Sequence, residues 1–156
     1  MDKSEPKIKI IVRNRKARYD FEIRGTIEAG IELKGSEVKS LRDGKANLGD
    51  AYAYIKNNEI FLRHMHISPY KMVGQSQPDP MRLRKLLLHR REIRKLFMQI
   101  QQKGITLVPL SVYFKGKVAK VELGMAVGRK QFDKRQAIAE KETKRRIDKA
   151  MRRSKD

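Results

Sequence analysis

Residues 128–156 form a strongly basic segment that can bury almost nothing, so the fold has to be built from the residues that precede it. The segment could be helical, but its large aliphatic residues Ile138, Ile147 and Met151 make too thin a stripe to dock firmly on a core. Low hydrophobicity and high charge predict that it is disordered in the free protein. Because lysine and arginine dominate it, we expect it to bind a polyanion.

The whole chain shares this charge. Its 156 residues carry a formal charge of +20, which favours a nucleic-acid partner over an acidic membrane surface or an acidic protein. A hydrophobic fraction of 39% suits one small core. The absence of cysteine excludes disulfides and thiolate metal sites. No apolar signal region is present near Met1, and no stretch approaches the about 20 apolar residues that span a bilayer. We therefore expect a cytoplasmic protein with no membrane partner.

Alternating apolar residues predict a mainly β-structured body. Asn14 is a helix cap between the first two strands, and Gly25 and Gly30 mark bulges or bends. A strand over residues 36–42 would place Lys39 and Leu41 on one face, before a hairpin-type turn at Asp43-Gly44. The predicted strands cover residues 7–13, 19–27 and a continuation to 42, the segments around 52–54 and 60–62 with a turn at Lys56-Asn57-Asn58 between them, and residues 105–114 and 118–127.

One long helix is predicted from Met81 to about Lys103, because its leucines, isoleucines and Phe97 recur at helical spacing. Asp79 is its expected cap, Pro80 its first residue and Gly104 its end. About six short strands and one long helix favour a β-barrel with added α-helices, of the oligonucleotide-binding type. We expect a flexible N-terminus over residues 1–7, the barrel over 8–127 and a basic C-terminal tail over 128–156.

No catalytic motif is complete. The segment from Gly30 to Ser36 has the glycine spacing of a phosphate loop but lacks the lysine that must follow the second glycine. His64 and His66 would share one face of a strand, yet no third ligand is suggested near them. No Ser-His-Asp arrangement or carboxylate pair can be argued either. The sequence therefore predicts no enzyme, no metal and no cofactor.

Basic residues alternate with aromatic residues between Arg13 and Phe21, which suits contacts to an RNA backbone together with base stacking. Equally, this could be a solvated edge with Tyr19 and Phe21 in the core. Glu28 and Glu37 are also open to two interpretations. Each could accept a hydrogen bond from a base, or each could form an internal salt bridge.

Several short motifs occur in order along the chain, and together they resemble the small protein B family. These motifs are Asn14-Arg15-Lys16-Ala17, Glu28-Ala29-Gly30-Ile31, Gly35 to Arg42, Gly44-Lys45-Ala46-Asn47, Arg84 to Leu88 and Asp133-Lys134-Arg135. The resemblance implies a protein without catalytic activity. It would bind the transfer-RNA-like domain of transfer-messenger RNA and deliver it to stalled ribosomes for trans-translation.

The resemblance also implies two sets of binding residues. RNA-binding residues would be Asn14, Arg15, Lys16, Glu28, Gly30, Lys34, Lys39, Arg42, Lys45, Asn47, Leu87 and His89. Residues of the tail that bind the ribosome would be Gly128, Arg129, Lys130, Phe132, Asp133, Lys134, Arg135, Lys144, Arg145 and Arg146. His89 stands where some relatives have Asn, Arg129 where Lys is commoner, and Phe132 where some have His.

The partners implied by the resemblance are transfer-messenger RNA and the ribosome. The tail would become helical in the empty message channel of the small subunit, near the decoding centre. Elongation factor Tu would be an indirect partner through the RNA, and the protein would act as a monomer. A basic ribosomal or ribosome-assembly protein that binds ribosomal RNA is the alternative, since it would also be small, basic and tailed.

Overall fold

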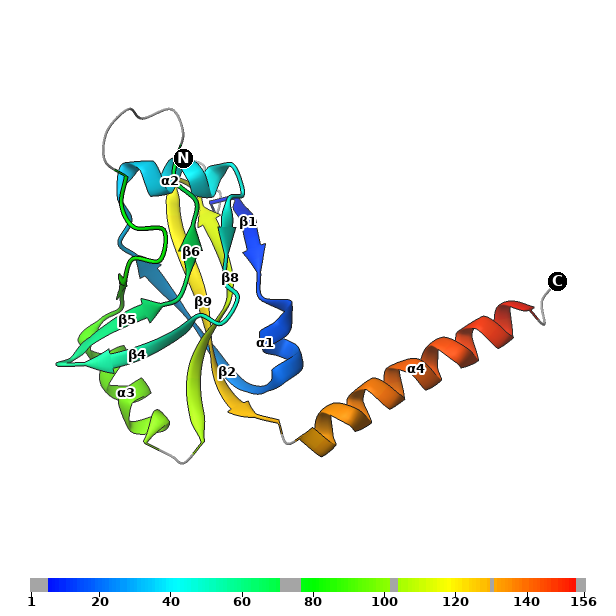
Figure 1. Ribbon diagram of the computed structural model, residues 1–156. Helices are drawn as coiled ribbons and strands as arrows, with labels where there is room; N and C mark the ends of the chain where they lie inside the picture. The colour runs from blue at the N-terminus through cyan, green and yellow to red at the C-terminus, as the bar shows by residue number, and fades with distance from the viewer. Residues whose placement is uncertain (1–5, 71–76, 102–103, 130, 154–156) are drawn as a thin grey trace, which may run out of the picture.

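The computed structural model describes residues 6–70, 77–101, 104–129 and 131–153. Within these ranges the chain forms nine strands and four helices (Figure 1). Their bounds are β1 (Ile8–Arg13), α1 (Arg15–Asp20), β2 (Phe21–Ile31), α2 (Gly35–Arg42), β3 (Ala46–Asn47), β4 (Tyr52–Lys56), β5 (Glu59–Arg63), β6 (His66–Ile67), β7 (Arg84–Leu87), α3 (Arg90–Ile100), β8 (Ile105–Lys115), β9 (Val118–Gly128) and α4 (Gln131–Arg153).

Seven strands form one antiparallel sheet in the order β1-β8-β4-β5-β7-β2-β9. The last strand in this order, β9, also pairs with β8, so the sheet curls back on itself. Strand β1 pairs with β8 and extends the sheet as an additional strand. The register of β2 with β9 shifts between Ile23 and Gly25, as the glycine in the sequence predicted. A Cβ at Gly25 would lie 2.5 Å from the terminal methyl of Met125, so a larger residue there would require this side chain to move.

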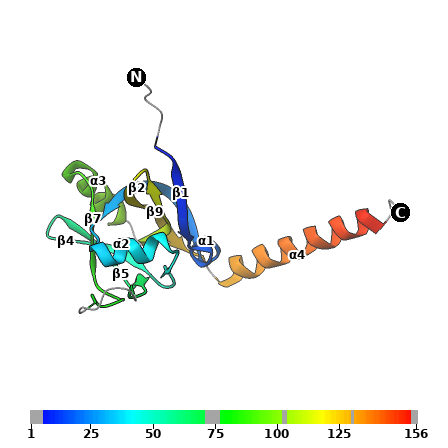
Figure 2. The ribbon, with the colours of Figure 1, turned by 90° about the horizontal axis from the view of Figure 1, so that it is seen from above.

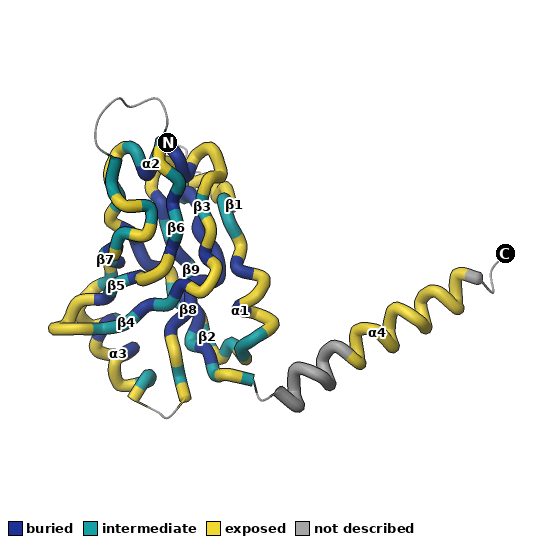
Figure 3. The backbone as a smooth tube through the Cα atoms, viewed as in Figure 1, coloured by how far each residue is buried: buried dark blue, intermediate teal, exposed yellow. Residues whose placement is uncertain are grey.

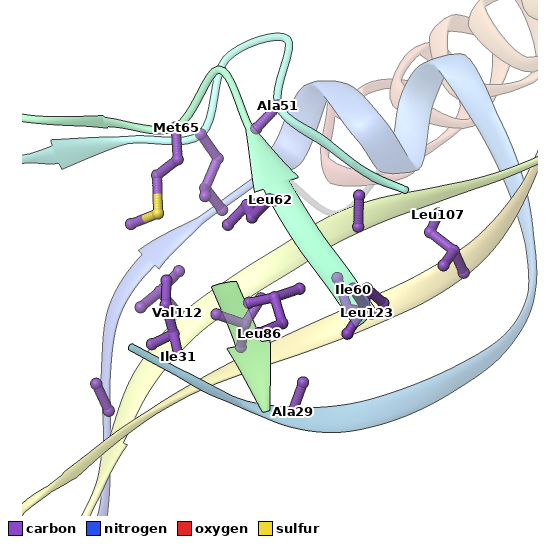
Figure 4. Packing of buried hydrophobic residues seen from close by; sticks show 14 of the residues in the cluster. Ala29, Ile31, Ala51, Ile60, Leu62, Met65, Leu86, Leu107, Val112 and Leu123 are labelled. Atoms are coloured by element: carbon purple, nitrogen blue, oxygen red, sulfur yellow. The ribbon is translucent and has the colours of Figure 1, made fainter. Parts of the chain in front are cut away.

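The hydrophobic core fills the space inside this curled sheet. Figure 4 shows side chains from several strands pointing into it, among them Ile60, Leu62, Leu86 and Leu123, all of which are at most 1% exposed. A second, small cluster lies under α1, where Ala17 packs against Leu110 and its neighbours. Helix α2 lies at one end of the curled sheet and α3 near the other (Figure 1).

Three sequence predictions for the body are confirmed. Strand β1 is followed by α1, which Asn14 caps by accepting a hydrogen bond from the Ala17 N–H at 3.1 Å. Strands β4 and β5 form a hairpin whose two turn residues, Asn57 and Asn58, have φ of 53° and 62°. Asparagine tolerates this left-handed conformation, which tight hairpin turns require. Strands β8 and β9 pair along nearly their full lengths.

The predicted long helix was wrong in its first part. Residues 84–87 form β7, which pairs with β5 and β2, and the helix begins only at Arg90. In β7 the side chains of Arg84 and Leu86 point inward and are buried, as the two-residue period of a strand requires. Asp79 does cap a local turn, since its Oδ1 accepts from the Met81 N–H at 2.8 Å, but no helix follows there. The N-cap of α3 is His89.

The predicted strand over residues 36–42 was also wrong, because these residues form α2. Its N-terminus is capped by Glu37, whose Oε1 accepts from the Lys34 N–H at 2.9 Å. At the other end Gly44 adopts φ of +72°, and its N–H donates to the Leu41 carbonyl at 2.9 Å. Asp43-Gly44 therefore ends a helix instead of joining two strands.

Helix α4 projects away from the sheet, as both views of the ribbon show (Figures 1 and 2). From residue 139 to residue 152 every side chain is exposed (Figure 3). That this segment is unfolded in the free protein stays a prediction. Among the described residues, no helix is both long and apolar enough to cross a bilayer.

Candidate RNA interface

Helix α2 presents a basic surface to solvent. Lys34 at its N-cap, Lys39 and Arg42 on the helix and Lys45 just after it are all exposed. Two of these cations lie over aromatic rings. The Nζ of Lys39 is 5.6 Å from the Tyr70 ring centre, and the guanidinium carbon of Arg42 is 5.2 Å from that of Phe114. Four cations around one helix can contact successive phosphates, which agrees with the predicted role of these residues.

A buried ion pair holds α2 on the body. The Nε of Arg84, a residue with no exposed surface, donates to Glu37 Oε2 at 2.8 Å, and Arg82 donates to Glu37 Oε1 at 2.5 Å. Arg84 also donates to the backbone carbonyls of Met65 at 2.6 Å and Pro80 at 3.1 Å. The two arginines that donate to Glu37 lie on β7 and just before it. One carboxylate therefore fixes the N-terminal turn of α2 to a strand that lies far away in the sequence.

The ionisation of Glu37 fits this role. Burial opposes its charge and would raise its pKa, but hydrogen bonds from Arg82, the Lys34 N–H and Arg84 outweigh burial and hold the pKa below its ordinary value. Burial likewise lowers the pKa of Arg84, and the Glu37 partner opposes that shift. Glu37 is 3% exposed. The internal salt bridge, one of the two interpretations open from the sequence, is therefore the structural role of Glu37.

Glu28 also has internal partners, although its side chain is 37% exposed. The Tyr113 hydroxyl donates to its Oε2, and the Lys115 Nζ lies 3.5 Å from its Oε1. The hydrogen bond from Tyr113 is the main reason why the pKa of Glu28 is lowered. Burial and the Glu28 partner together raise the pKa of Tyr113. The exposed edge of this carboxylate still allows the predicted RNA contact, which stays a prediction.

The predicted contacts at α1 differ in their surroundings. Asn14 is 6% exposed and uses its side chain internally, since its Nδ2 donates to the Pro109 carbonyl at 2.9 Å. Arg15 is exposed and lines a shallow depression together with Arg13 and Arg18. Lys16 is exposed and lies 3.0 Å from Asp50, a hydrogen bond that raises the pKa of the lysine.

The aromatic residues near α1 divide between the two interpretations that the sequence left open. Phe21 packs against the small cluster under the helix, whereas Tyr19 is 43% exposed. Asn14 thus positions the helix, and the neighbouring cations and Tyr19 remain accessible.

Gly30 and Leu87 lie directly opposite each other in the pairing of β2 with β7. A Cβ at Gly30 would lie 3.2 Å from the Leu87 Cβ, so glycine leaves room for the leucine, which is 51% exposed. His89 follows two residues later and is exposed at the N-cap of α3, where its N–H donates to Glu92 Oε1 at 3.1 Å. The structure therefore brings three predicted contacts close together.

Asn47 lies in β3 and lines a shallow depression with His64 and His66. The two histidines do not share a strand face, contrary to the sequence prediction. His64 follows β5 with φ of 66°, and His66 begins β6. Asn47 Oδ1 accepts from the Gly49 N–H at 2.8 Å. Nowhere in the described part of the chain do three or more metal-ligating His, Cys, Asp or Glu residues come together.

The predicted tail residues begin at the end of the sheet. Gly128 ends β9, and the Arg129 N–H donates to the Asp20 carbonyl at 3.1 Å. Lys130 lies outside the described residues. Phe132, Asp133, Lys134 and Arg135 lie in α4, but their side chains are outside the described part, whereas Lys144, Arg145 and Arg146 are exposed.

Two features of this surface were missed from the sequence. The first is the buried Arg84, which lies within the range predicted as a helix. Residues 84–87 (Arg-Lys-Leu-Leu) show no alternation of polar and apolar residues, and helical spacing continues across them, so the sequence held no local signal for this strand. The second is a series of aromatic rings on the hairpin of β4 and β5, formed by Tyr52, Tyr54, Phe61 and His64. Its signal was the alternation of Tyr52 and Tyr54 with small or aliphatic residues.

A family model described as SmpB protein matches residues 11–153, nearly the whole chain. The chain belongs to the SmpB family. Its similarity to the SsrA-binding protein of Alkaliphilus oremlandii is 56% identity over 144 residues, covering 92% of this chain and 93% of the relative. The SsrA-binding protein of Halothermothrix orenii is 53% identical over 145 residues, covering 93% and 94%.

A solved structure of the SmpB family agrees with the fold. The chain is similar to one from the structure described as "tmRNA-SmpB: a journey to the center of the bacterial ribosome". The TM-score is 0.67 at 46% identity, and the match covers 81% of this chain and 93% of that one. The resemblance seen in the sequence motifs is thereby confirmed, together with a mainly β fold that carries several helices.

Proposed function

We propose that this protein binds the transfer-RNA-like domain of transfer-messenger RNA and carries it to stalled ribosomes in trans-translation. Its relatives are SsrA-binding proteins, and the similar solved chain belongs to a tmRNA-SmpB structure that concerns the bacterial ribosome. The observation that carries the proposal is the exposed basic surface of α2, fixed to the body by the buried Glu37–Arg84 pair. A rigid array of cations recognises folded RNA by the shape of its backbone.

The body acts as an oligonucleotide-binding barrel, which the return of the sheet order through β8 supports. Three surfaces contact the RNA. One is the surface of α2 with Lys34, Lys39, Arg42 and Lys45. The second combines Glu28, Gly30, Leu87 and His89. The third is the accessible side of α1 with Arg15 and Lys16, which Asn14 positions, together with Asn47. The protein acts without catalysis or cofactor, as a cytoplasmic monomer, and meets elongation factor Tu only through the RNA.

The tail acts on the ribosome. Residues 128–156 occupy the empty message channel of the small subunit and are helical there, near the decoding centre. An exposed helix with lysines and arginines on several sides suits a channel lined by phosphates. An occupied channel leaves the tail without a site, so tail binding selects ribosomes that lack a message. The contacting residues are Gly128, Arg129, Lys130, Phe132, Asp133, Lys134, Arg135, Lys144, Arg145 and Arg146.

Truncation after Lys130 tests this division of labour. We expect the truncated protein to bind the isolated transfer-RNA-like domain with nearly unchanged affinity, because the binding surfaces of the body remain. Peptide tagging on stalled ribosomes should be abolished. A matched variant replaces Lys144, Arg145 and Arg146 by glutamate, which keeps the tail length but turns three positive charges into negative ones, and it should also lose tagging. Equal loss of RNA binding and tagging on truncation would contradict separate roles for body and tail.

A further inference from the structure

Four aromatic rings follow one another over the hairpin of β4 and β5. In order they are Phe61, Tyr54, Tyr52 and His64, and we call them the aromatic row. Neighbouring ring centres are 5.8, 6.3 and 5.7 Å apart. The ring planes are tilted by 34°, 42° and 50°, so no neighbouring pair is stacked face to face.

The aromatic row is not part of the hydrophobic core. The alternate residues of the same hairpin, Ala53, Ile60 and Leu62, are buried, so the rings belong to the outward face. Phe61 packs against neither of the two hydrophobic clusters that the described residues form. The hydroxyls of Tyr52 and Tyr54 make no hydrogen bond within the described part of the chain. Tyr54 and Phe61 do form a cross-strand pair, which helps to hold the hairpin.

Cross-strand pairing does not explain the other half of the aromatic row. Tyr52 lies opposite Arg63 in the register of the hairpin, and its ring partner His64 comes after the strand has ended. His64 has φ of 66°, a left-handed conformation that residues other than glycine rarely adopt. Its ring nevertheless lies beside Tyr52 and is exposed. The row thus extends past the paired strands.

Cations surround these rings. Lys56 ends β4, Arg63 lies opposite Tyr52, and Lys85 on β7 lies opposite Phe61. Lys56 and Arg63 make no ion pair with any described residue, whereas Lys85 lies 3.5 Å from Glu59. Aromatic faces with unpaired cations beside them are the combination that holds single-stranded nucleic acid, since bases stack on the rings and cations contact the phosphates.

The aromatic row also connects two parts of the candidate interface. At one end Phe61 pairs with Lys85, which is two residues from the exposed Leu87 on β7. At the other end His64 lines the same depression as Asn47. A strand of RNA that followed the row would therefore pass between these two predicted contacts without leaving the surface.

We propose that the aromatic row is a stacking surface for the unpaired bases of a single-stranded RNA segment. Tyr52, Tyr54, Phe61 and His64 take the bases, and Lys56 and Arg63 contact the backbone. Such binding is largely independent of sequence, because every base has a stacking face. The inference goes beyond the proposed function, which requires only recognition of a folded RNA domain, so either can fail without the other.

Binding of two labelled probes by the full-length protein tests the row at one fixed salt concentration. The probes are a ten-nucleotide oligouridylate and an abasic ribose-phosphate oligomer of the same length. We expect the oligouridylate to bind more tightly, because the abasic oligomer offers phosphates without bases. Replacing Tyr54→Ala should weaken oligouridylate binding roughly five- to a hundredfold. Tyr54→Phe keeps the ring and should bind nearly as the original protein does.

Two further variants separate stacking from hairpin stability. Tyr54→Leu keeps an apolar partner for Phe61 but removes the aromatic face, so oligouridylate binding should fall while the melting temperature stays close to the original. Phe97→Ala removes an exposed aromatic ring on α3, outside the row, and should leave this binding unchanged. The proposal is overturned if the abasic oligomer binds as tightly as oligouridylate, or if Tyr54→Leu binds as well as Tyr54→Phe. Affinity for the transfer-RNA-like domain, measured on the same proteins, reports on the proposed function separately.

Discussion

Helices α2 and α4 are both rich in lysine and arginine, but they are held in opposite ways. Helix α2 has eight residues, among which Glu37, Ser40 and Leu41 are buried. Helix α4 has 23 residues, and every side chain described from residue 139 to residue 152 is exposed. The shorter helix is fixed by one buried carboxylate, whereas the longer helix has no comparable buried face in the range whose side chains are described.

The difference shows that cationic composition alone does not determine how firmly a helix is held. A helix whose cations are held in fixed positions loses little conformational freedom on binding and can recognise the shape of a folded RNA. A helix without a buried face has to be stabilised by its partner, so its ordering becomes part of the binding reaction. A helix that is anchored to the body can therefore serve as a preformed recognition surface, whereas an unanchored helix becomes ordered only with its partner.

Removing the anchor of α2 should have the largest effect. Arg84→Ala leaves the buried Glu37 carboxylate with only Arg82 and the Lys34 N–H, and it also removes the donor to the Met65 and Pro80 carbonyls. We expect the free energy of unfolding to fall by about 3–5 kcal/mol. Urea denaturation measures the change. Lys85→Ala is the matched control in the same strand, because its ion pair with Glu59 is exposed and should contribute at most about 1 kcal/mol. Equal losses in the two variants would show that the buried pair does not anchor α2.

The anchor also explains why the sequence predicted some elements and missed others. The cap at Asn14 and the turn at Asn57-Asn58 depend on residues within a few positions of one another, and both were predicted correctly. Arg84 and Glu37 are 47 positions apart, so no local pattern in the sequence could indicate their contact. Helical spacing in the sequence could not reveal that pairing with β5 and β2 overrides it.

The wrong strand prediction over α2 has a different cause, because local signals for a helix were present in the sequence. Glu37 occupies the third helical position, and Gly44 follows the last turn in a left-handed conformation. The alternation of Val38 with its neighbours was read as a strand, although both capping signals favoured a helix. The predicted RNA-binding residues came from motifs, and the structure adds which of them are accessible, such as Lys39, and which are buried, such as Asn14.

A smaller effect should follow from acid, which weakens the same anchor reversibly. The pKa of Glu37 in the folded protein is below its ordinary value near 4.5. Ionised Glu37 therefore stabilises the fold at pH above 4.5, and this contribution is lost as the pH falls through the folded pKa. We expect the unfolding free energy to decrease with acid over that range. It should decrease less in Glu37→Gln, which is less stable at neutral pH.

Unfolding by urea at a series of pH values measures this slope. Some acid sensitivity should remain in Glu37→Gln, because the pKa of Glu28 is also lowered and that carboxylate contributes with the same sign. A variant whose stability falls with acid as steeply as that of the original protein would show that Glu37 does not contribute to the slope. The buried charge of Glu37 would then not be what distinguishes α2 from α4.

The smallest effect on stability should come from removing α4. Because its described side chains are exposed, deletion of residues 131–156 should change the free energy of unfolding by no more than about 0.5 kcal/mol. The helix has favourable Glu140–Lys144 and Glu142–Arg146 spacings, but like charges such as Lys141 and Arg145 also face each other one turn apart. An isolated basic helix of this kind is marginal in water.

Circular dichroism of the full-length and truncated proteins decides whether α4 is ordered in the free protein. If the tail is unfolded in the free protein, the helical signal per molecule should be nearly the same with and without residues 131–156. Addition of a polyanion such as heparin should then raise the helical signal of the full-length protein only, since neutralised charges no longer repel one another. A full helical contribution from the free tail would instead show that α4 is already helical without a partner. The two helices would then differ only in that α2 is fixed to the body and α4 is not.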